Sequence, residues 1–259
     1  MKHFISGLLV FLVSWGYSQD TIGGFTFTTA SILVDNNKNI YLYDNNSLVK
    51  RTEDSRILNF SKKMFGDISL VDVSNPHKTL VFYKSQGVCI FLDNYLKELR
   101  DPIYFNDIGM MDVEIACSGS DNTVWCFDNS TSALFKIDDR LKIVARSPDI
   151  SKLSTTKKSP SLLLERDDKI FLLLPDFGLL IFSNSGEYVQ TIHLKEYSCL
   201  IPLSDKSIFF INQGIPTIYD FYTSTYKQYS HVEQNTVFFY NQETLFQYKT
   251  GIVIMTKLQ

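Results

Sequence analysis

The sequence predicts an all-β fold: a six-bladed β-propeller of four-stranded antiparallel blades, with the ring closed by an N-terminal strand. One phrase recurs six times along the 259 residues: a polar turn rich in Asp, Asn and Lys, an apolar strand, a second polar turn and another apolar strand. The phrase repeats about every 40 residues, and no long stretch has the apolar spacing of an amphipathic helix. A period near 40 built from short strands is typical of a propeller blade.

The period follows from aligning the first apolar residue of each copy. These residues are Ile40, Leu80, Val124, Ile170, Ile208 and Leu245. Their successive spacings are 40, 44, 46, 38 and 37 residues. Asn, Asp and Gly fill the turns between the strands, because these residues tolerate positive φ and the Asn and Asp side chains bond their own backbone. An antiparallel sandwich or an open barrel would also be rich in strands, but neither explains the period.

The remaining strands of each blade lie on either side of the phrase. Innermost strands are predicted at residues 30–34, 68–73, 113–117, 161–165, 198–203 and 236–240. The clearest outer strands are predicted at residues 56–60, 141–146 and 188–194. The sixth copy runs out at Gln259 without a fourth strand. We therefore expect residues 25–29, which alternate between apolar and polar, to form the outermost strand of the last blade.

The first 18 residues have the layout of a secretory signal peptide. Lys2 precedes an apolar run over residues 4–15, and small residues follow, so cleavage is expected between Ser18 and Gln19. The apolar run is shorter than the roughly 20 residues that a membrane span needs; the alternative is a buried N-terminal helix. Residues 19–259 are then a single propeller domain without a transmembrane segment, exported to the periplasm or associated with the outer membrane.

The charge balance excludes nucleic acid as a partner. The chain has 25 Lys and Arg against 28 Asp and Glu, and without Lys2 the balance is 24 against 28. A nucleic-acid binder carries a concentrated basic face, and an anionic membrane surface attracts polybasic runs. The sequence has neither feature.

Four cysteines lie in apolar, strand-like runs: Cys89, Cys117, Cys126 and Cys199. Cys117 and Cys126 flank a predicted hairpin loop, so a disulfide between them is one interpretation and buried free thiols are the other. The spacing of Cys and His does not match a zinc site, and we predict no cofactor.

Catalytic motifs are lacking in the sequence. The segment SNPHK, residues 74–78, is interpreted as a turn between two strands because its equivalents in the other copies are turns. PDFG, residues 175–178, is interpreted as the turn between the second and third strands of the fourth blade. A metal on the propeller axis would need carboxylates of the inner strands to converge. The candidates are Asp35, Asp72, Asp112, Glu114 and Glu165.

Partner contacts are predicted on the propeller face that carries the connections between blades and the turns between second and third strands. Loop 100–111 is the first candidate, with Tyr104, Phe105, Met110 and Met111. Loop 146–160 is the second, and the aromatic residues Phe177 and Tyr222 are the third. Aromatic residues and Met are the anchors that protein interfaces use. The alternative is that these side chains tuck beneath their loops and close the central channel.

The phrases NIYLYDNNSLVKRTED and NTVWCFDNSTSALFKIDD resemble blades of secreted six-bladed propellers. VDVSNPHKTLVFY followed by IFLDNYL resembles a family of propeller proteins exported by flavobacterium-like Gram-negative bacteria. This resemblance implies a propeller fold and export from the cytoplasm. It carries no catalytic motif. We expect a non-catalytic scaffold that docks protein partners in an envelope assembly or secretion complex. The alternative is a secreted enzyme or glycan-binding propeller, of a metal-dependent hydrolase or lactonase type, that uses the central channel.

Overall fold

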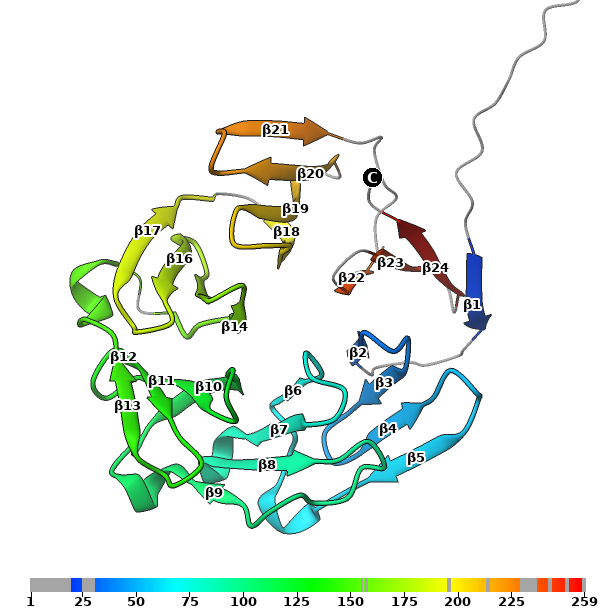
Figure 1. The fold of residues 1–259 in the computed structure, drawn as a ribbon, viewed down its shortest axis with the longest axis horizontal. Coiled ribbons are helices and arrows are strands. Elements are labelled where there is room, and N and C mark those ends of the chain that lie inside the picture. Colours follow the sequence, from blue (N-terminus) through cyan, green and yellow to red (C-terminus); the bar gives the residue numbers. More distant parts are fainter. Residues whose placement is uncertain are drawn as a thin grey trace, which may run out of the picture.

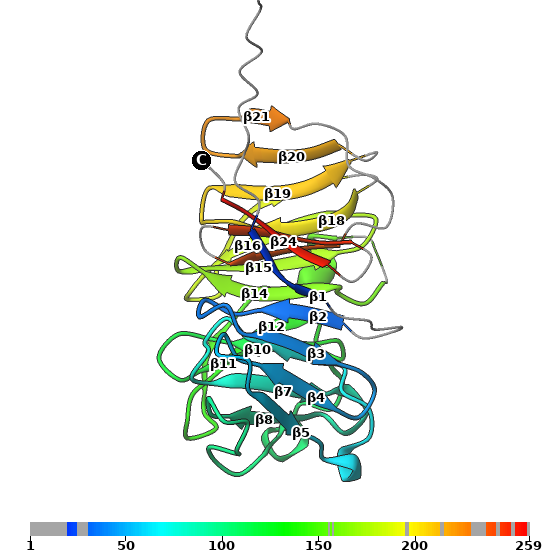
Figure 2. The same ribbon diagram turned by 90° about the vertical axis from the view of Figure 1, so that its right-hand side faces the viewer.

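The structure is a computed structural model and describes part of the chain. The described residues are 20–24, 31–154, 156, 158–194, 197–212, 215–228, 237–241, 244–249 and 252–257. They form four-stranded antiparallel sheets arranged in a ring around a central axis, seen face-on in Figure 1 and from the side in Figure 2. The predicted all-β propeller with four-stranded antiparallel blades is therefore confirmed. The predicted signal peptide, residues 1–18, lies outside the described residues.

Five blades are each formed by four consecutive strands. The first blade has β2 (Ser31–Val34), β3 (Ile40–Tyr43), β4 (Leu48–Arg51) and β5 (Ile57–Phe60). The second has β6 (Leu70–Asp72), β7 (Thr79–Tyr83), β8 (Val88–Leu92) and β9 (Ile103–Tyr104). The third has β10 (Val113–Ser118), β11 (Val124–Asp128), β12 (Ala133–Ile137) and β13 (Ile143–Arg146). The fourth has β14 (Leu162–Arg166), β15 (Lys169–Leu174), β16 (Gly178–Ser183) and β17 (Tyr188–Ile192). The fifth has β18 (Tyr197–Pro202), β19 (Ser207–Asn212), β20 (Ile215–Asp220) and β21 (Thr225–Gln228).

One further sheet combines the two ends of the chain. Its order is β1 (Asp20–Gly24), β24 (Ile252–Lys257), β23 (Thr244–Lys249) and β22 (Val237–Asn241). Five blades rather than six are thus built from consecutive strands, and this sheet is a composite. The prediction that an N-terminal strand pairs with the end of the chain is confirmed, but its position was wrong. Asp20 lies opposite Met255, whereas the predicted strand, residues 25–29, lies outside the described residues.

A five-residue turn begins at the end of the third strand, or directly after it, in four of the blades. In each case the side chain of its first residue accepts a hydrogen bond from the backbone N–H of the fifth. The first residues are Thr52, Asp93, Asp138 and Ser183. The fourth residue of each turn has a positive φ; these residues are Ser55, Leu96, Leu141 and Gly186. The side-chain bond offsets the cost of that backbone conformation at the three non-glycine positions.

Side chains from neighbouring blades fill the spaces between them. Phe82 and Phe91 of the second blade, for example, share one buried cluster with Val124 and Phe135 of the third. Because both faces of these blades are covered, β7 and β8 are buried at every position, so apart from Thr79 their sequences are runs of apolar and aromatic residues instead of alternating. Outer strands such as β13 are largely exposed. The described helices are four 3-10 turns: η1 (Lys63–Phe65), η2 (Lys84–Gln86), η3 (Phe105–Ile108) and η4 (Ile150–Lys152). No described helix has the length and apolar character needed to cross a membrane.

The antiparallel order gives the ring two distinct faces. We call the top face the one with the connections between blades and the turns between second and third strands. The bottom face carries the turns between first and second strands and between third and fourth strands. SNPHK joins β6 to β7 on the bottom face, which confirms that it is a turn. PDFG joins β15 to β16 on the top face, also as predicted. Its Gly178 has φ +142°, and a Cβ there would lie 2.3 Å from the Ile192 carbonyl oxygen, so the glycine is a structural requirement.

Candidate binding surfaces

The predicted contact loop 100–111 presents only part of its apolar side chains. Tyr104 is 40% exposed and Met111 is 72% exposed. Phe105 and Met110 are buried in the cluster between the second and third blades, so their assignment as contact residues was wrong. Phe105 packs edge-on against Phe82 with ring centroids 6.0 Å apart, and the Met110 Sδ lies 3.5 Å from the Cys126 Sγ. The loop is thus anchored by two buried residues while two others face solvent.

Tyr104 is joined by a further exposed residue of the top face that the sequence analysis did not single out. The Tyr104 ring lies edge-on to Phe65, with centroids 6.1 Å apart, and Phe65 is the last residue of η1. Its neighbour Met64 is 73% exposed. We refer to Met64, Tyr104 and Met111 as the top-face apolar residues.

The other predicted contact residues are separated by the fold. Phe177 lies on the top face but is half-buried, edge-on to His193 with centroids 5.2 Å apart. Tyr222 is 79% exposed, but it lies in the turn between β20 and β21 and therefore on the bottom face. The prediction that Tyr222 shares a face with Phe177 was wrong. In loop 146–160, Ile150 is buried against the third and fourth blades, so the described part of this loop is anchored to the core.

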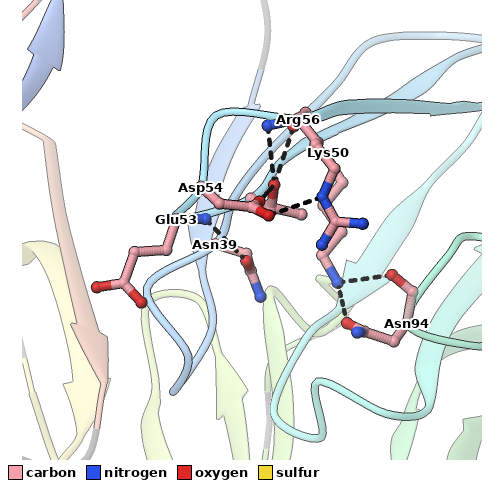
Figure 3. A network of polar contacts seen from close by, with 7 residues as sticks. Asn39, Lys50, Glu53, Asp54, Arg56 and Asn94 are labelled. Carbon is pink, nitrogen blue, oxygen red and sulfur yellow. Dashed lines mark hydrogen bonds and ion pairs between the residues drawn. The ribbon is translucent and has the colours of Figure 1, made fainter.

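A polar groove of about 460 Å³ crosses the bottom face between the first and second blades. It is lined by Asn37, Asn39, Thr52, Glu53, Asp54, Arg56 and Asn94. Figure 3 shows Arg56 and Asp54 at its edge, where the Arg56 Nε donates to the Asp54 Oδ2 at 2.8 Å. Hydrogen bonds from Thr52 and Arg56 hold the pKa of Asp54 below its usual value. The lining offers amide, carboxylate and guanidinium groups to a ligand, and these groups favour polar molecules.

A buried carboxylate supports the inner wall of this groove. Asp35 accepts hydrogen bonds from the backbone N–H and the side-chain amide of Asn39, at 2.9 and 2.7 Å, and from the Tyr41 hydroxyl at 2.9 Å. Burial and the nearby Asp35 raise the pKa of Tyr41, which therefore stays protonated as a donor. The Asn39 Oδ1 accepts from the Glu53 N–H at 3.2 Å and so ties two turns of the first blade together.

A buried lysine joins the two blades through Asn94, one of the residues that line the groove. Lys50 is fully buried, and its Nζ donates to the side-chain and main-chain oxygens of Asn94, at 2.6 and 3.1 Å (Figure 3). The ammonium lies 5.1 Å from the centre of the Tyr41 ring. Burial lowers the pKa of Lys50, although Asp35 and Asp93 act in the opposite direction. Asn94 is therefore the residue that compensates a desolvated charge.

Cys89, Cys117 and Cys126 are unsuited to nucleophilic chemistry. Cys117 lies opposite Trp125 and Cys126 lies opposite Ala116, so the two thiols project from opposite faces of the sheet into different clusters. The structure describes both as free, and the disulfide interpretation is corrected to the alternative of buried free thiols. Burial raises the pKa of Cys89, Cys117 and Cys126, which keeps them in the unreactive thiol form. The side chain of Cys199 lies outside the described residues.

The carboxylates proposed for an axial metal are held apart by structural hydrogen bonds. Asp72 accepts from the Ser118 N–H at 2.7 Å, Glu165 from the Trp125 Nε1 at 2.9 Å, and Asp112 from the Asn129 amide at 2.8 Å. Glu114 pairs with Lys84 at 2.6 Å. Among the described residues, no three His, Cys, Asp or Glu side chains gather in a way that could hold a metal ion.

Comparison with known proteins shows the fold. No protein-family model matches the chain, and no curated protein matches it. Among solved structures, it is similar to a streptogramin B lyase, with a TM-score of 0.61, 11% identity and coverage of 94% of this chain and 98% of that chain. It is also similar to a catalytically inactive virginiamycin B lyase from Staphylococcus aureus with quinupristin, with a TM-score of 0.62, 11% identity and coverage of 91% and 83%. A third similar structure is BBS1N in complex with ARL6DN, with a TM-score of 0.59, 11% identity and coverage of 88% and 77%. These neighbours include both enzymes and proteins in complexes, so they support the propeller fold and no single activity.

Proposed function

We propose that this protein is a non-catalytic propeller that docks protein partners in a cell-envelope assembly or secretion complex, after export to the periplasm or the outer membrane. We further propose that the composite sheet is the sixth blade and that β1 closes the ring. Contacts of β22 with both β18 and β2 support this closure, because β18 belongs to the fifth blade and β2 to the first.

The exposed apolar residues of the top face are the main support for docking. Phe105 and Met110 fix the loop in the core, so Tyr104 and Met111 are presented on a rigid support. Rigid presentation lowers the entropy lost on binding, and aromatic residues and Met are enriched at interfaces. Similar propellers are also found in protein complexes: BBS1N with ARL6DN is one, and a mitotic checkpoint complex is another, with a TM-score of 0.59.

The docking function is tested by capturing partners from cross-linked envelopes of the host organism with the tagged protein, and mapping the cross-links by mass spectrometry. Tyr104→Ala combined with Met111→Ala is expected to lose the captured partner without lowering the melting temperature. Tyr222→Ala is the matched control, because it removes a highly exposed tyrosine from the opposite face. Retention of the partner by the double variant, or cross-links confined to the bottom face, would contradict docking through the top face.

The polar groove supports a second candidate, a secreted glycan-binding propeller. Its amide and charged side chains suit the hydroxyl groups of a sugar, but it lies at a seam of the bottom face rather than in the central channel. A glycan array, followed by calorimetry on Arg56→Ala, tests this candidate. The alternative of a metal-dependent hydrolase is tested by measuring divalent metal in the purified protein. Without glycan binding and without metal, both alternatives fail.

A further inference from the structure

The seams between blades follow a repeated pattern on the bottom face. Lys50 of the first blade reaches Asn94 in the five-residue turn of the second, and Lys136 of the third blade reaches Asn184 in the same turn of the fourth. Both asparagines occupy the second position of their turns. Each lysine also lies beside an aromatic ring: Lys50 is 5.1 Å from the centre of Tyr41, and Lys136 is 5.7 Å from that of Trp125. In these two seams, one cation meets one neutral asparagine.

The seam between the second and third blades departs from this pattern because it holds two cations. The Lys78 Nζ lies 4.2 Å from the centre of the Phe91 ring, and the Arg100 Cζ lies 4.7 Å from the same centre. Lys78 ends the SNPHK turn, and its contact with the Asn122 amide oxygen is long, at 3.3 Å. Cation–π contacts stabilise each charge in part, but two like charges beside one ring repel each other.

Arg100 has an unused hydrogen-bonding edge. Its Nε and Nη2 are both buried, and neither has a hydrogen-bond partner in the described part of the chain. These two nitrogens form one edge of the guanidinium, the fork that binds the two oxygens of a carboxylate in parallel. Buried donors without a partner are costly, so such a pair indicates a missing acceptor.

The neighbouring blade does not supply this acceptor. Asp139 takes the turn position of Asn94 and Asn184, but it is exposed and forms no ion pair with Arg100 or Lys78 among the described residues. Its charge acts on Arg100 only through space. Burial, and then the charge of Arg100, lower the pKa of Lys78 to about 8, although the charge of Asp139 acts in the opposite direction.

We propose that the seam between the second and third blades binds a carboxylate, held by the Nε–Nη2 edge of Arg100 and by the ammonium of Lys78. His77 and Leu99, which are next to Lys78 and Arg100 in the sequence, are exposed, as are Asn122 and Asp139 of the third blade. The carboxylate belongs either to a small organic acid or to an acidic side chain of a peptide. This site lies on the face opposite the top-face apolar residues and does not depend on their docking function.

The test follows the Nε–Hε resonance of Arg100 in the ¹⁵N-labelled protein, assigned by its loss in Arg100→Lys. The probes are sodium acetate, the peptide acetyl-Gly-Glu-Gly-amide and sodium chloride, at constant ionic strength and pH 6.5. Both carboxylates are expected to give a saturable shift that chloride does not give. Lys78→Met should weaken binding by about tenfold, the loss of one charge-assisted contact. Asp139→Asn should strengthen binding, because it removes a competing negative charge.

The two probes separate the sources of the carboxylate. Tighter binding of the peptide than of acetate assigns the site to acidic side chains of a protein, and equal or weaker binding assigns it to small acids. Affinity should fall between pH 7 and 9 in the wild type as Lys78 loses its proton, and this fall should be absent in Lys78→Met. If Arg100→Lys does not fold, the Asp139→Asn and Lys78→Met titrations still decide the matter. An equal shift with chloride, no saturation, or weaker binding by Asp139→Asn would overturn the proposal.

Discussion

Removal of the Asn94 side chain should expose the cost of burying Lys50. In Asn94→Ala, the Lys50 ammonium loses its 2.6 Å acceptor and keeps only the main-chain oxygen at 3.1 Å. A hydrogen bond to a buried charge contributes about 1.5–3 kcal/mol, so we expect the free energy of unfolding to fall by about 2 kcal/mol. In a chain of this size, that corresponds to a fall of about 4–8 °C in melting temperature.

The assay is denaturant unfolding of four proteins that form a double-mutant cycle: wild type, Asn94→Ala, Lys50→Met and the double variant. Lys50→Met replaces the buried cation by an apolar chain of similar length, so its own effect should be small. In its presence, Asn94→Ala should have almost no effect, which gives a coupling energy of about 2 kcal/mol. Asn37→Ala, at an exposed position of the same groove, is the control. A loss below about 0.5 kcal/mol in Asn94→Ala, or a coupling near zero, would refute the reasoning.

Four further predictions concern the loop anchor, a titrating lysine, the thiols and a turn. Phe105→Ala should lower the free energy of unfolding by about 3–5 kcal/mol, whereas Tyr104→Ala should lower it by about 1 kcal/mol or less, in the same denaturant assay. The pKa of Lys78 is about 8 in the folded protein against an ordinary 10.5, so the unfolded chain binds more protons between these values. Stability should therefore rise with pH across that window in the wild type and not in Lys78→Met; equal slopes would contradict the shift. Iodoacetamide should modify Cys89, Cys117 and Cys126 only after unfolding, as read by peptide mass, and rapid native labelling would show that they are accessible. Gly178→Ala should cost at least about 2 kcal/mol through its positive φ and the contact with the Ile192 carbonyl oxygen, and a wild-type melting curve would count against that contact.

The repeat made most of the fold predictable from the sequence. Ile40, Leu80 and Val124 each fall in the second strand of a blade, and the predicted innermost strands lie within two residues of those observed. This succeeded because turn chemistry and short apolar runs are local properties of the chain. The five-residue turn also recurs in the sequence, for instance as DNYLK at residues 93–97 and DDRLK at 138–142. It could therefore have been predicted, but the sequence analysis did not single it out.

The candidate sites were less predictable because they depend on contacts between blades. Phe105 and Met110 point inward while Tyr104 and Met111 point outward, an order set by the 3-10 turn η3 and by the neighbouring blade instead of by a simple period. Tyr222 was placed on the wrong face, although counting strands along the repeat would have assigned it to the turn between the third and fourth. The contact of Lys50 with Asn94 joins two blades. The contacts of Lys78 and Arg100 with Phe91 join separate segments of the second blade. Composition and spacing do not encode those distances.

The pairing of β1 with β24 also sets an order of events during synthesis. Residues 20–24 are synthesised early, but their hydrogen-bonded neighbours, residues 252–257, are synthesised much later. Until then β1 has no strand beside it, so this sheet forms after the blades made of consecutive strands, at the high entropic cost of a contact between distant residues. A chain that stops before residue 252 would leave β23 with an open edge, and such edges recruit foreign strands. The pairing of β1 with β24 thus distinguishes molecules that include residues 252–257 from those that stop before them.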